Sequence, residues 1–287
     1  WLGGAHALKF DIKTYNINPS IALRATERVS IGAGISIQRM EVEYSRLAAV
    51  VSPALATTKA TLSAGDTSWG WNVGALFTVS PSTKVGVSYR SKIRHTLEGD
   101  LSVRGPAQGA SAALTSGSAK AFVELPDTFI LSVAQQLNDK WEMLGDVSWT
   151  GWSSIDKVDI VRTSGSLSGR TVQTLDTAFR DSWRYALGAN YRFSDTLKLK
   201  FGVAYDQTPV PDTAHRLVSL PDANRTWLTT GAQIKLDKAS TVDLGAAYIQ
   251  VSESHIDNRQ ASLGRGDVKG VYDARVWILG AQYSMAF

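Results

Sequence analysis

The 287-residue chain contains no cysteine, and it has no apolar run long enough for a membrane-spanning helix. Such a helix needs about 18 consecutive, mostly apolar residues. The longest candidate, residues 47–56, is interrupted by Ser52 and Pro53. A helical membrane protein is therefore excluded. The lack of cysteine suits a chain exposed to the periplasm, but it also suits many cytosolic proteins and leaves the compartment open.

The sequence also has little that would support nucleic-acid binding, metal binding or catalysis. The formal charge is only +4, and no run of Lys or Arg is dense enough for a nucleic-acid patch. The histidines lie in or near different predicted loops and do not have the spacing of metal ligands; they are His6, His95, His215 and His255. No local motif marks a nucleophile. We therefore expect no nucleic-acid partner, no metal, no cofactor, no catalytic residue and no enzymatic activity.

What the chain does contain is a period-two alternation along most of its length. In residues 197–206 every odd position is apolar or aromatic, and every even position is charged or small. The same pattern recurs at 29–37, 69–79 and 185–193. Strands of a transmembrane β-barrel alternate in this way because one face meets lipid and the other meets the lumen, and this keeps the mean hydropathy near zero, here −0.09. A soluble β-sandwich alternates too, but its strands are usually only about 5–6 residues long.

Short and long connections between these runs follow one another in strict order. The short ones, rich in turn-forming residues, fall at 26–28, 80–83, 137–140, 194–196 and 237–239. The long ones are expected at 45–65, 99–119, 162–176, 208–223 and 256–268. Bacterial barrels place short turns in the periplasm and long loops outside. This order predicts an all-β, antiparallel transmembrane β-barrel with about eleven strands.

Aromatic residues gather toward both ends of the predicted strands, as in the two interface girdles of membrane proteins. Beside the short turns lie Trp141, Tyr191 and Phe193. Toward the long loops lie Trp69, Trp149, Trp152, Trp183, Trp227 and Tyr248.

The predicted strand number is odd, whereas single-chain bacterial barrels have an even number. The last predicted strand ends on the aromatic Phe287, which is expected at the periplasmic interface. Counting back through about eleven strands then puts Trp1 on the outer side, and the sequence does not open on a signal peptide. We therefore interpret residues 1–287 as one transmembrane β-barrel domain that is N-terminally truncated.

Several segments resemble the FadL family of outer-membrane channels for long-chain fatty acids and hydrocarbons. They are TYNINPSIALRATERVSIGAGISIQRMEVEYSRL, WGWNVGALFTVSPSTKVGVSYRSKIRHTLEGDL, LPDTFILSVAQQLNDKWEMLGDVSWTGWSSI and FRDSWRYALGANYRFSDTLKLKFGVAYDQTPVPDTAHRLVSLPDANRTWLTTGAQIKL. The resemblance runs from about residue 8 to the C-terminus. It implies a barrel of about fourteen strands, a lumen plugged by an N-terminal hatch, a ligand groove at the extracellular loops and a deeper pocket with a lateral exit.

Candidate ligand-binding residues follow from the loop composition and from the resemblance. Leu47, Val51 and Leu55 are spaced to share a helical face in an unusually apolar loop. They suit the capture of alkyl chains, although packing against a neighbouring loop would explain them equally well. The resemblance implies that Arg46 pairs with a ligand carboxylate. The family's usual lysine partner falls on Leu175, so Arg170 or Arg180 would have to substitute, or the ligand is less acidic than a fatty acid.

The leading functional hypothesis is passive uptake of long-chain fatty acids or other hydrophobic compounds across the bacterial outer membrane. The alternatives are a structural or adhesive outer-membrane barrel and a general diffusion porin. Expected partners are the fatty acid or hydrocarbon ligand, outer-membrane lipid and lipopolysaccharide. The complete protein is expected to be a monomer.

Overall fold

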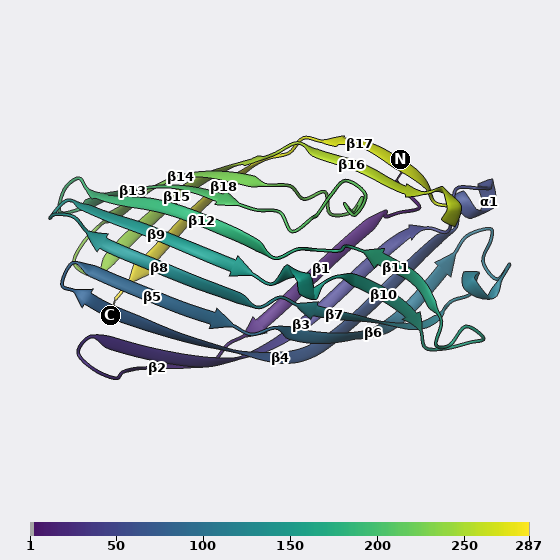
Figure 1. The fold of residues 1–287 in the computed structure, drawn as a ribbon, viewed down its shortest axis with the longest axis horizontal. Helices are drawn as coiled ribbons and strands as arrows, with labels where there is room; N and C mark the ends of the chain where they lie inside the picture. The colour runs from purple at the N-terminus through teal and green to yellow at the C-terminus, as the bar shows by residue number, and fades with distance from the viewer. Residues whose placement is uncertain (1–2, 287) are drawn as a thin grey trace.

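The computed structural model describes residues 3–286, so Trp1 and Phe287 lie outside the described residues. Nearly all of its regular structure is antiparallel β (Figure 1). The strands are β1 (Lys9–Ile17), β2 (Ser20–Arg24), β3 (Val29–Leu47), β4 (Lys59–Ser80), β5 (Thr83–Arg90), β6 (Ile93–Arg104), β7 (Gly117–Leu125), β8 (Thr128–Gln136), β9 (Trp141–Thr150), β10 (Lys157–Arg162), β11 (Thr171–Asp176), β12 (Ser182–Arg192), β13 (Leu197–Asp206), β14 (Arg225–Lys235), β15 (Ser240–Val251), β16 (Ser254–Gln260), β17 (Gly266–Tyr272) and β18 (Arg275–Met285).

The helical segments are short: α1 (Pro53–Ala56), η1 (Ala112–Leu114), η2 (Trp152–Ser154) and η3 (Ala261–Leu263). Within residues 3–286, none of them is long and apolar enough to cross a membrane.

Most predicted strands are interrupted near mid-height, which explains why about eleven predicted strands correspond to more segments in the structure. The break between β1 and β2 shows how. Ile17 lies opposite Ile37 and Ser20 opposite Gly34, so both segments keep one register against β3. The ladder stops only at Asn18 and Pro19, because proline has no N–H to donate. The total of about fourteen strands implied by the resemblance stays a prediction.

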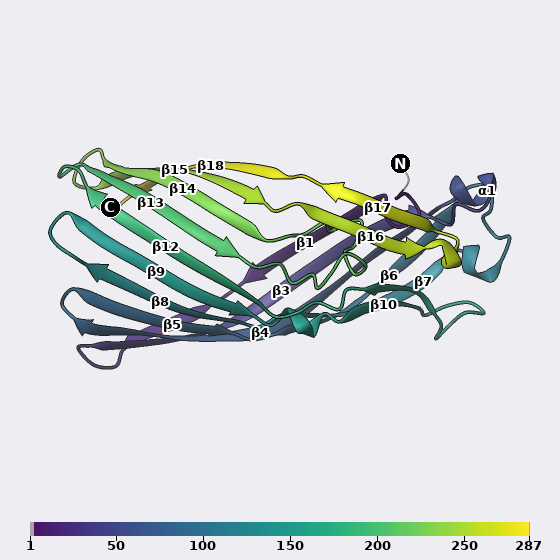
Figure 2. The ribbon, with the colours of Figure 1, turned by 45° about the horizontal axis from the view of Figure 1, so that its top comes forward.

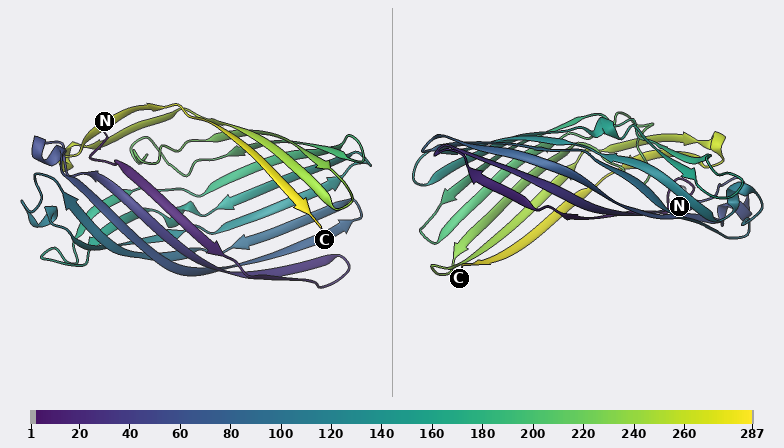
Figure 3. Two further views of the ribbon diagram at one scale, coloured as in Figure 1. Left: turned by 180° about the vertical axis from the view of Figure 1, so that it is seen from behind. Right: turned by 90° about the horizontal axis from the view of Figure 1, so that it is seen from below.

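The interruptions divide the sheet into two halves joined by β3 and β4, which run through both (Figures 1 and 2). In the half that ends in tight turns, the short-turn half, the order is β2-β3-β4-β5-β8-β9-β12-β13-β14-β15-β18. In the other, the loop half, β1-β3-β4-β6-β7-β10-β11 are neighbours, and β16 and β17 form a separate hairpin. Among the described residues β1 pairs only with β3, and β18 pairs only with β15. Figure 3 shows β1 and β18 separated from each other.

The tight turns lie where the sequence predicts them, between β2 and β3, β4 and β5, β8 and β9, β12 and β13, and β14 and β15. Four of the five long connections are shorter than predicted. The strands leave only 48–58, 105–116, 163–170 and 261–265 between them, whereas the connection at 207–224 agrees with the prediction. The physical reason is that the strands of the loop half continue beyond the part that can face lipid, and there their outward-facing residues are charged. The pattern of apolar outward residues that predicts a membrane strand therefore ends before the strand itself ends.

Strand β3 shows this change along its length. In the short-turn half its odd positions are apolar and exposed, namely Ile31, Ile35 and Ile37. In the loop half the apolar residues stand at even positions, and Met40 and Tyr44 are buried. Pairing of β3 with β4 continues without a register shift, so each face keeps its direction. The inward face therefore changes from polar to apolar, while the outward face changes from apolar to charged.

On the exterior of the loop half, neighbouring side chains consequently form ion pairs instead of apolar contacts. Lys9 Nζ lies 2.8 Å from Glu43 Oε2, and Arg39 Nε lies 3.4 Å from Glu41 Oε1. These side chains are about half exposed, so each pair contributes little to stability. Their position marks this part of the wall as water-facing.

Aromatic clusters on the outside confirm most of the predicted girdles. At the short-turn end the ring centroids of Trp141 and Tyr191 lie 4.6 Å apart. At the opposite end of the short-turn half, the ring centroids of Tyr248 and Trp277 lie 4.7 Å apart. Two girdle predictions are wrong. Trp152 packs edge-on against Phe179 inside the molecule. Trp227 also faces inward, because it lies opposite the buried Ala204 of β13, and its ring contacts the guanidinium of Arg184. Trp152 is carried inward by η2, where the alternation that underlies the prediction is interrupted.

Candidate ligand-binding cavities

A cavity of about 550 Å³ lies near the loop end of the molecule, and we call it the outer cavity. It is lined by Tyr44, Arg46, Ala48, Ala60, Leu62, Leu101, Val103, Ala113, Leu114, Ile160, Leu167, Arg170, Thr171, Val172 and Gln173. Its walls are mostly apolar, and its charged lining residues are both arginines. The outer cavity therefore combines an apolar surface with positive charge.

Arg46 is held in place by hydrogen bonds to its own strand end and across the lumen. Its Nη1 donates to the carbonyl oxygens of Leu47 and Ala48, each at 2.9 Å, and its Nε donates to Gln173 Oε1. No carboxylate lies within salt-bridge distance of Arg46 among the described residues. A guanidinium without an acidic partner, at the wall of a cavity, can receive an anionic ligand.

Two further basic side chains, Arg265 and His6, lie in the loops behind Arg46, and the Arg265 guanidinium adds to this positive character. Burial lowers the pKa of the Arg265 guanidinium, which donates to Gln260 Oε1 at 3.0 Å. Burial also lowers the pKa of His6, and its Nε2 lies 3.0 Å from Gly266 O. Neither group is paired with a carboxylate among the described residues.

A second cavity of about 330 Å³, the inner chamber, lies deeper in the loop half. Its walls come from all sides of the lumen: Phe10, Ile12, Thr14, Met40, Val42, Tyr44, Leu62, Ala64, Leu97, Ala121, Val123, Leu125, Trp152, Ile155, Val158, Ile160, Leu175, Thr177, Phe179, Leu217 and Leu220. None of these residues is charged. The chamber is therefore suited to the apolar part of a ligand and not to water or ions.

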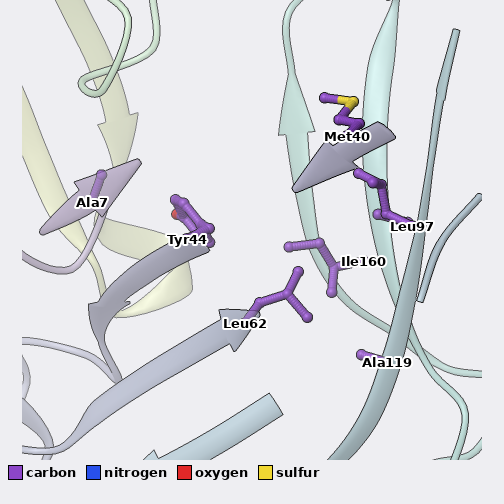
Figure 4. Close-up of a cluster of buried hydrophobic side chains, with 8 residues drawn as sticks. Ala7, Met40, Tyr44, Leu62, Leu97, Ala119 and Ile160 are labelled. Atoms are coloured by element: carbon purple, nitrogen blue, oxygen red, sulfur yellow. The ribbon is translucent and has the colours of Figure 1, made fainter. Parts of the chain in front are cut away.

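The two cavities share three lining residues, Tyr44, Leu62 and Ile160. All three belong to the buried apolar cluster of the loop half, which Figure 4 shows with side chains from different strands facing a common space. Tyr44 and Leu62 are each only 4% exposed. These side chains form a partition between the outer cavity and the inner chamber.

Polar groups close the inner chamber on the side of the short-turn half. His95 Nδ1 lies 2.9 Å from Asp66 Oδ2, and His95 Nε2 lies 3.1 Å from Gln38 Oε1. Each of the three residues stands two positions along its strand from a chamber residue, as Gln38 does from Met40. The buried His95 ring, 1% exposed, thus marks the level at which the apolar lumen gives way to the polar one.

The residues proposed from sequence fall at different places. Arg46 and Arg170 line the outer cavity, and Leu175 lines the inner chamber. Arg180 lines neither and donates from Nη2 to Pro211 O at 3.2 Å. Of the two basic residues that could accompany Arg46, the structure brings only Arg170 to the same cavity.

Leu47, Val51 and Leu55 line neither cavity, whereas Ala48 in the same segment lines the outer cavity. Leu47 is the last residue of β3, and Leu55 lies in α1, whose N-cap Ser52 accepts from Leu55 N at 3.4 Å. Val51 lies beside Gly264, and the neighbouring Val50 N donates to Gly264 O at 2.8 Å. The segment therefore contacts the β16–β17 hairpin, and its role in ligand capture stays a prediction.

Sequence reasoning missed Tyr44 and Gln173. A signal for Tyr44 was present: Met40, Val42 and Tyr44 continue the alternation of β3 with the apolar residues on the opposite face. Nothing in the sequence indicates Gln173, because β11 and β3 are not neighbours in the sheet and meet only across the lumen.

Comparison with known proteins gives consistent matches. The family model described as "Outer membrane protein transport protein (OMPP1/FadL/TodX)" matches residues 1–287. The chain is 26% identical over 312 residues to a long-chain fatty acid transport protein of Salmonella typhi, covering 100% of the chain and 69% of that protein. It is 29% identical over 239 residues to the putative outer membrane protein NMB0088 of Neisseria meningitidis, covering 77% of the chain and 51% of that protein.

Solved structures show the same fold. A FadL homologue of Pseudomonas aeruginosa superposes with a TM-score of 0.89 at 24% identity, over 99% of this chain and 70% of that one. The toluene transporter TodX of P. putida superposes with a TM-score of 0.68 at 16% identity, over 100% of this chain and 74% of that one.

Proposed function

Because the chain belongs to the OMPP1/FadL/TodX family of outer-membrane transport proteins, we propose that it takes part in passive uptake of long-chain fatty acids or other hydrophobic compounds across the outer membrane. The observation that carries this proposal is the outer cavity with Arg46, which has no acidic partner among the described residues, next to an uncharged inner chamber. A fatty acid has one carboxylate and one apolar tail, and the two spaces match these two parts.

Energetics favour this use of the two spaces. Each methylene moved from water into the inner chamber contributes about 0.8 kcal/mol. A carboxylate that follows its tail into an apolar site must be paired, and a guanidinium is the donor best matched to it. We therefore assign Arg46, with Arg170 as its companion, to the ligand's head, and the inner chamber to its tail.

The relatives point to the same class of ligand. One is named a long-chain fatty acid transport protein and another a toluene transporter, so related proteins take both acids and neutral hydrocarbons. The two arginines of the outer cavity favour an acid here. Since the relatives are transporters, we propose no catalytic activity.

Neither alternative function gains a specific observation. A general diffusion porin needs a water-filled lumen, whereas the lumen of the loop half holds the apolar inner chamber. The exposed aliphatic and aromatic exterior supports contact with outer-membrane lipid and lipopolysaccharide.

The proposal is tested with Arg46→Ala and a matched control, Arg94→Ala, whose side chain is 83% exposed on the outer wall. Binding of a long-chain fatty acid to the protein in nanodiscs should weaken by about 2 kcal/mol in Arg46→Ala, because a desolvated carboxylate loses its charged donor. An alkane of equal length should bind both variants like the wild type. Equal losses for acid and alkane would show that Arg46 only shapes the cavity, and no binding of either by the wild type would refute the proposed function.

A further inference from the structure

A chain of hydrogen bonds connects the arginine of the outer cavity to the partition. Arg46 Nε donates to Gln173 Oε1, and Gln173 Nε2 donates to Tyr44 Oη at 2.7 Å. Tyr44 Oη in turn donates to the carbonyl oxygen of His6. All bonds run in the same direction, so each group is held by the one before it. Gln173 and Tyr44 are buried, at 7% and 4% exposure, so water does not readily replace these bonds.

The ring at the end of this chain fills the boundary between the two spaces. Tyr44 lines the outer cavity and the inner chamber, and Phe10 meets its ring edge-on at 5.7 Å on the chamber side. Leu62 and Ile160 complete the partition from β4 and β10 and carry no polar anchor. The tyrosine is thus the one member of this shared set, within the described residues, that is fixed by hydrogen bonds.

We propose that Tyr44 is a gate between the outer cavity and the inner chamber, latched by Gln173 and released when a ligand carboxylate takes Gln173's place at Arg46. This inference rests on the proposed function and assigns regulation to the same site. Gln173 is a positioning residue: it acts on the ligand's path through Tyr44.

Acceptor chemistry provides the release. A carboxylate is a stronger acceptor for a guanidinium N–H than a neutral amide oxygen, because both partners of the bond are charged. When the carboxylate occupies Arg46 Nε, Gln173 loses the contact that orients its amide, and its bond to Tyr44 Oη weakens. Of the hydrogen bonds described for Tyr44, only the one to the His6 carbonyl then remains, and the ring can turn away from the opening. A neutral ligand of the same length has no charged acceptor and leaves the latch closed.

The latch gives acids a kinetic advantage that can be measured. A brominated long-chain fatty acid and its methyl ester carry the same tail, and bromine quenches indole fluorescence on contact. Trp152 lines the inner chamber, so the part of the quenching that disappears in Trp152→Phe reports arrival of the tail there. Stopped-flow mixing with the protein in nanodiscs then gives an arrival rate for each ligand.

In the wild type we expect the acid to reach the inner chamber about tenfold faster than the ester, the ratio that corresponds to one hydrogen bond. In Tyr44→Phe and in Gln173→Leu the ester should speed up until the two rates agree within about threefold. Tyr248→Phe is the matched control. It removes a Tyr–Gln hydrogen bond of 2.6 Å to Gln250 at a residue that lines neither cavity, and it should leave the ratio unchanged.

The outcomes separate the latch from the function. If both ligands bind the wild type and the rate ratio stays the same in Tyr44→Phe and Gln173→Leu, the latch is refuted while the proposed uptake stands. If neither ligand binds the wild type at equilibrium, the proposed function itself is refuted. Circular dichroism of each variant identifies a folding defect, and two variants that act on opposite ends of one hydrogen bond keep the test decisive if one of them fails to fold.

Discussion

Replacing Ala121 by leucine should shorten the ligand tail that the inner chamber accepts. Ala121 lies in β7 opposite Leu97 and Ile160, and it lines the chamber. The substitution adds three carbon atoms to a space of about 330 Å³. We expect these carbons to displace about three methylenes of a ligand long enough to fill the chamber, each worth about 0.8 kcal/mol.

The resulting loss is about 2.4 kcal/mol, which corresponds to roughly 50-fold in affinity. Only long ligands should lose it. In the wild type, affinity should rise about fourfold per added methylene until the chamber is full and then level off. In Ala121→Leu the rise should have the same slope but end about three carbons earlier.

Competition with a fluorescent fatty acid, using straight-chain acids from hexanoate to stearate and protein in nanodiscs, measures both curves. Ala189→Leu makes the same change on the outward face, beside Leu187, which is 64% exposed. It should leave the curve as in the wild type. If Ala121→Leu weakens short and long acids equally, or leaves the chain-length limit where it was, the inner chamber does not hold the tail.

Two further predictions concern the loops of the loop half. Burial lowers the pKa of His6, so the folded protein favours the neutral ring; the buried position of the ring should be stable above the ordinary value of 6.5 and be lost progressively as the pH falls below it, even though its bond to Gly266 O favours the protonated form. Hydrogen exchange of residues 3–8 should speed up at acidic pH, and in His6→Gln it should not change with pH beyond the intrinsic exchange rate. Gly105→Ala should lower the free energy of unfolding by about 1–3 kcal/mol, because the φ of Gly105 is +140° and a Cβ there would lie 2.6 Å from Thr58 Cα. Gly109→Ala, with φ +76° and open space around it, should lose only about 1 kcal/mol, and equal melting points for the two variants would contradict this.

The sequence predicts the membrane-facing part of the fold well, because lipid imposes a simple rule on every second residue. Runs such as 197–206 and the tight turns between them identify strands and their order. The rule is lost in the loop half, where water replaces lipid outside and apolar side chains replace polar ones inside. There the odd positions of β3 become charged, as at Glu41 and Glu43, and the predicted loops begin too early.

The candidate site is predicted only in part, for a similar reason. The resemblance implies a role for Arg46, and the structure places it in a cavity. A choice between Arg170 and Arg180 cannot be made from sequence, since both lie near the expected position and only the path of β11 separates them. Contacts such as that between Tyr44 and Gln173 join residues 129 positions apart across the lumen, where strand order gives no guidance.

Strand β3 also imposes a demand on assembly. In the loop half, carboxylates on its outward face alternate with apolar side chains on its inward face. Shifting the register of β3 against β4 by one residue would turn the carboxylates inward and the apolar side chains outward. Glu41 and Glu43 would then enter the inner chamber, where each uncompensated carboxylate costs several kcal/mol, while Met40 and Tyr44 would face water. A barrel with β3 and β4 out of register is therefore strongly destabilised. The same alternation that lines the binding site thus also selects the correct register when the β3–β4 hairpin, which joins both halves, inserts.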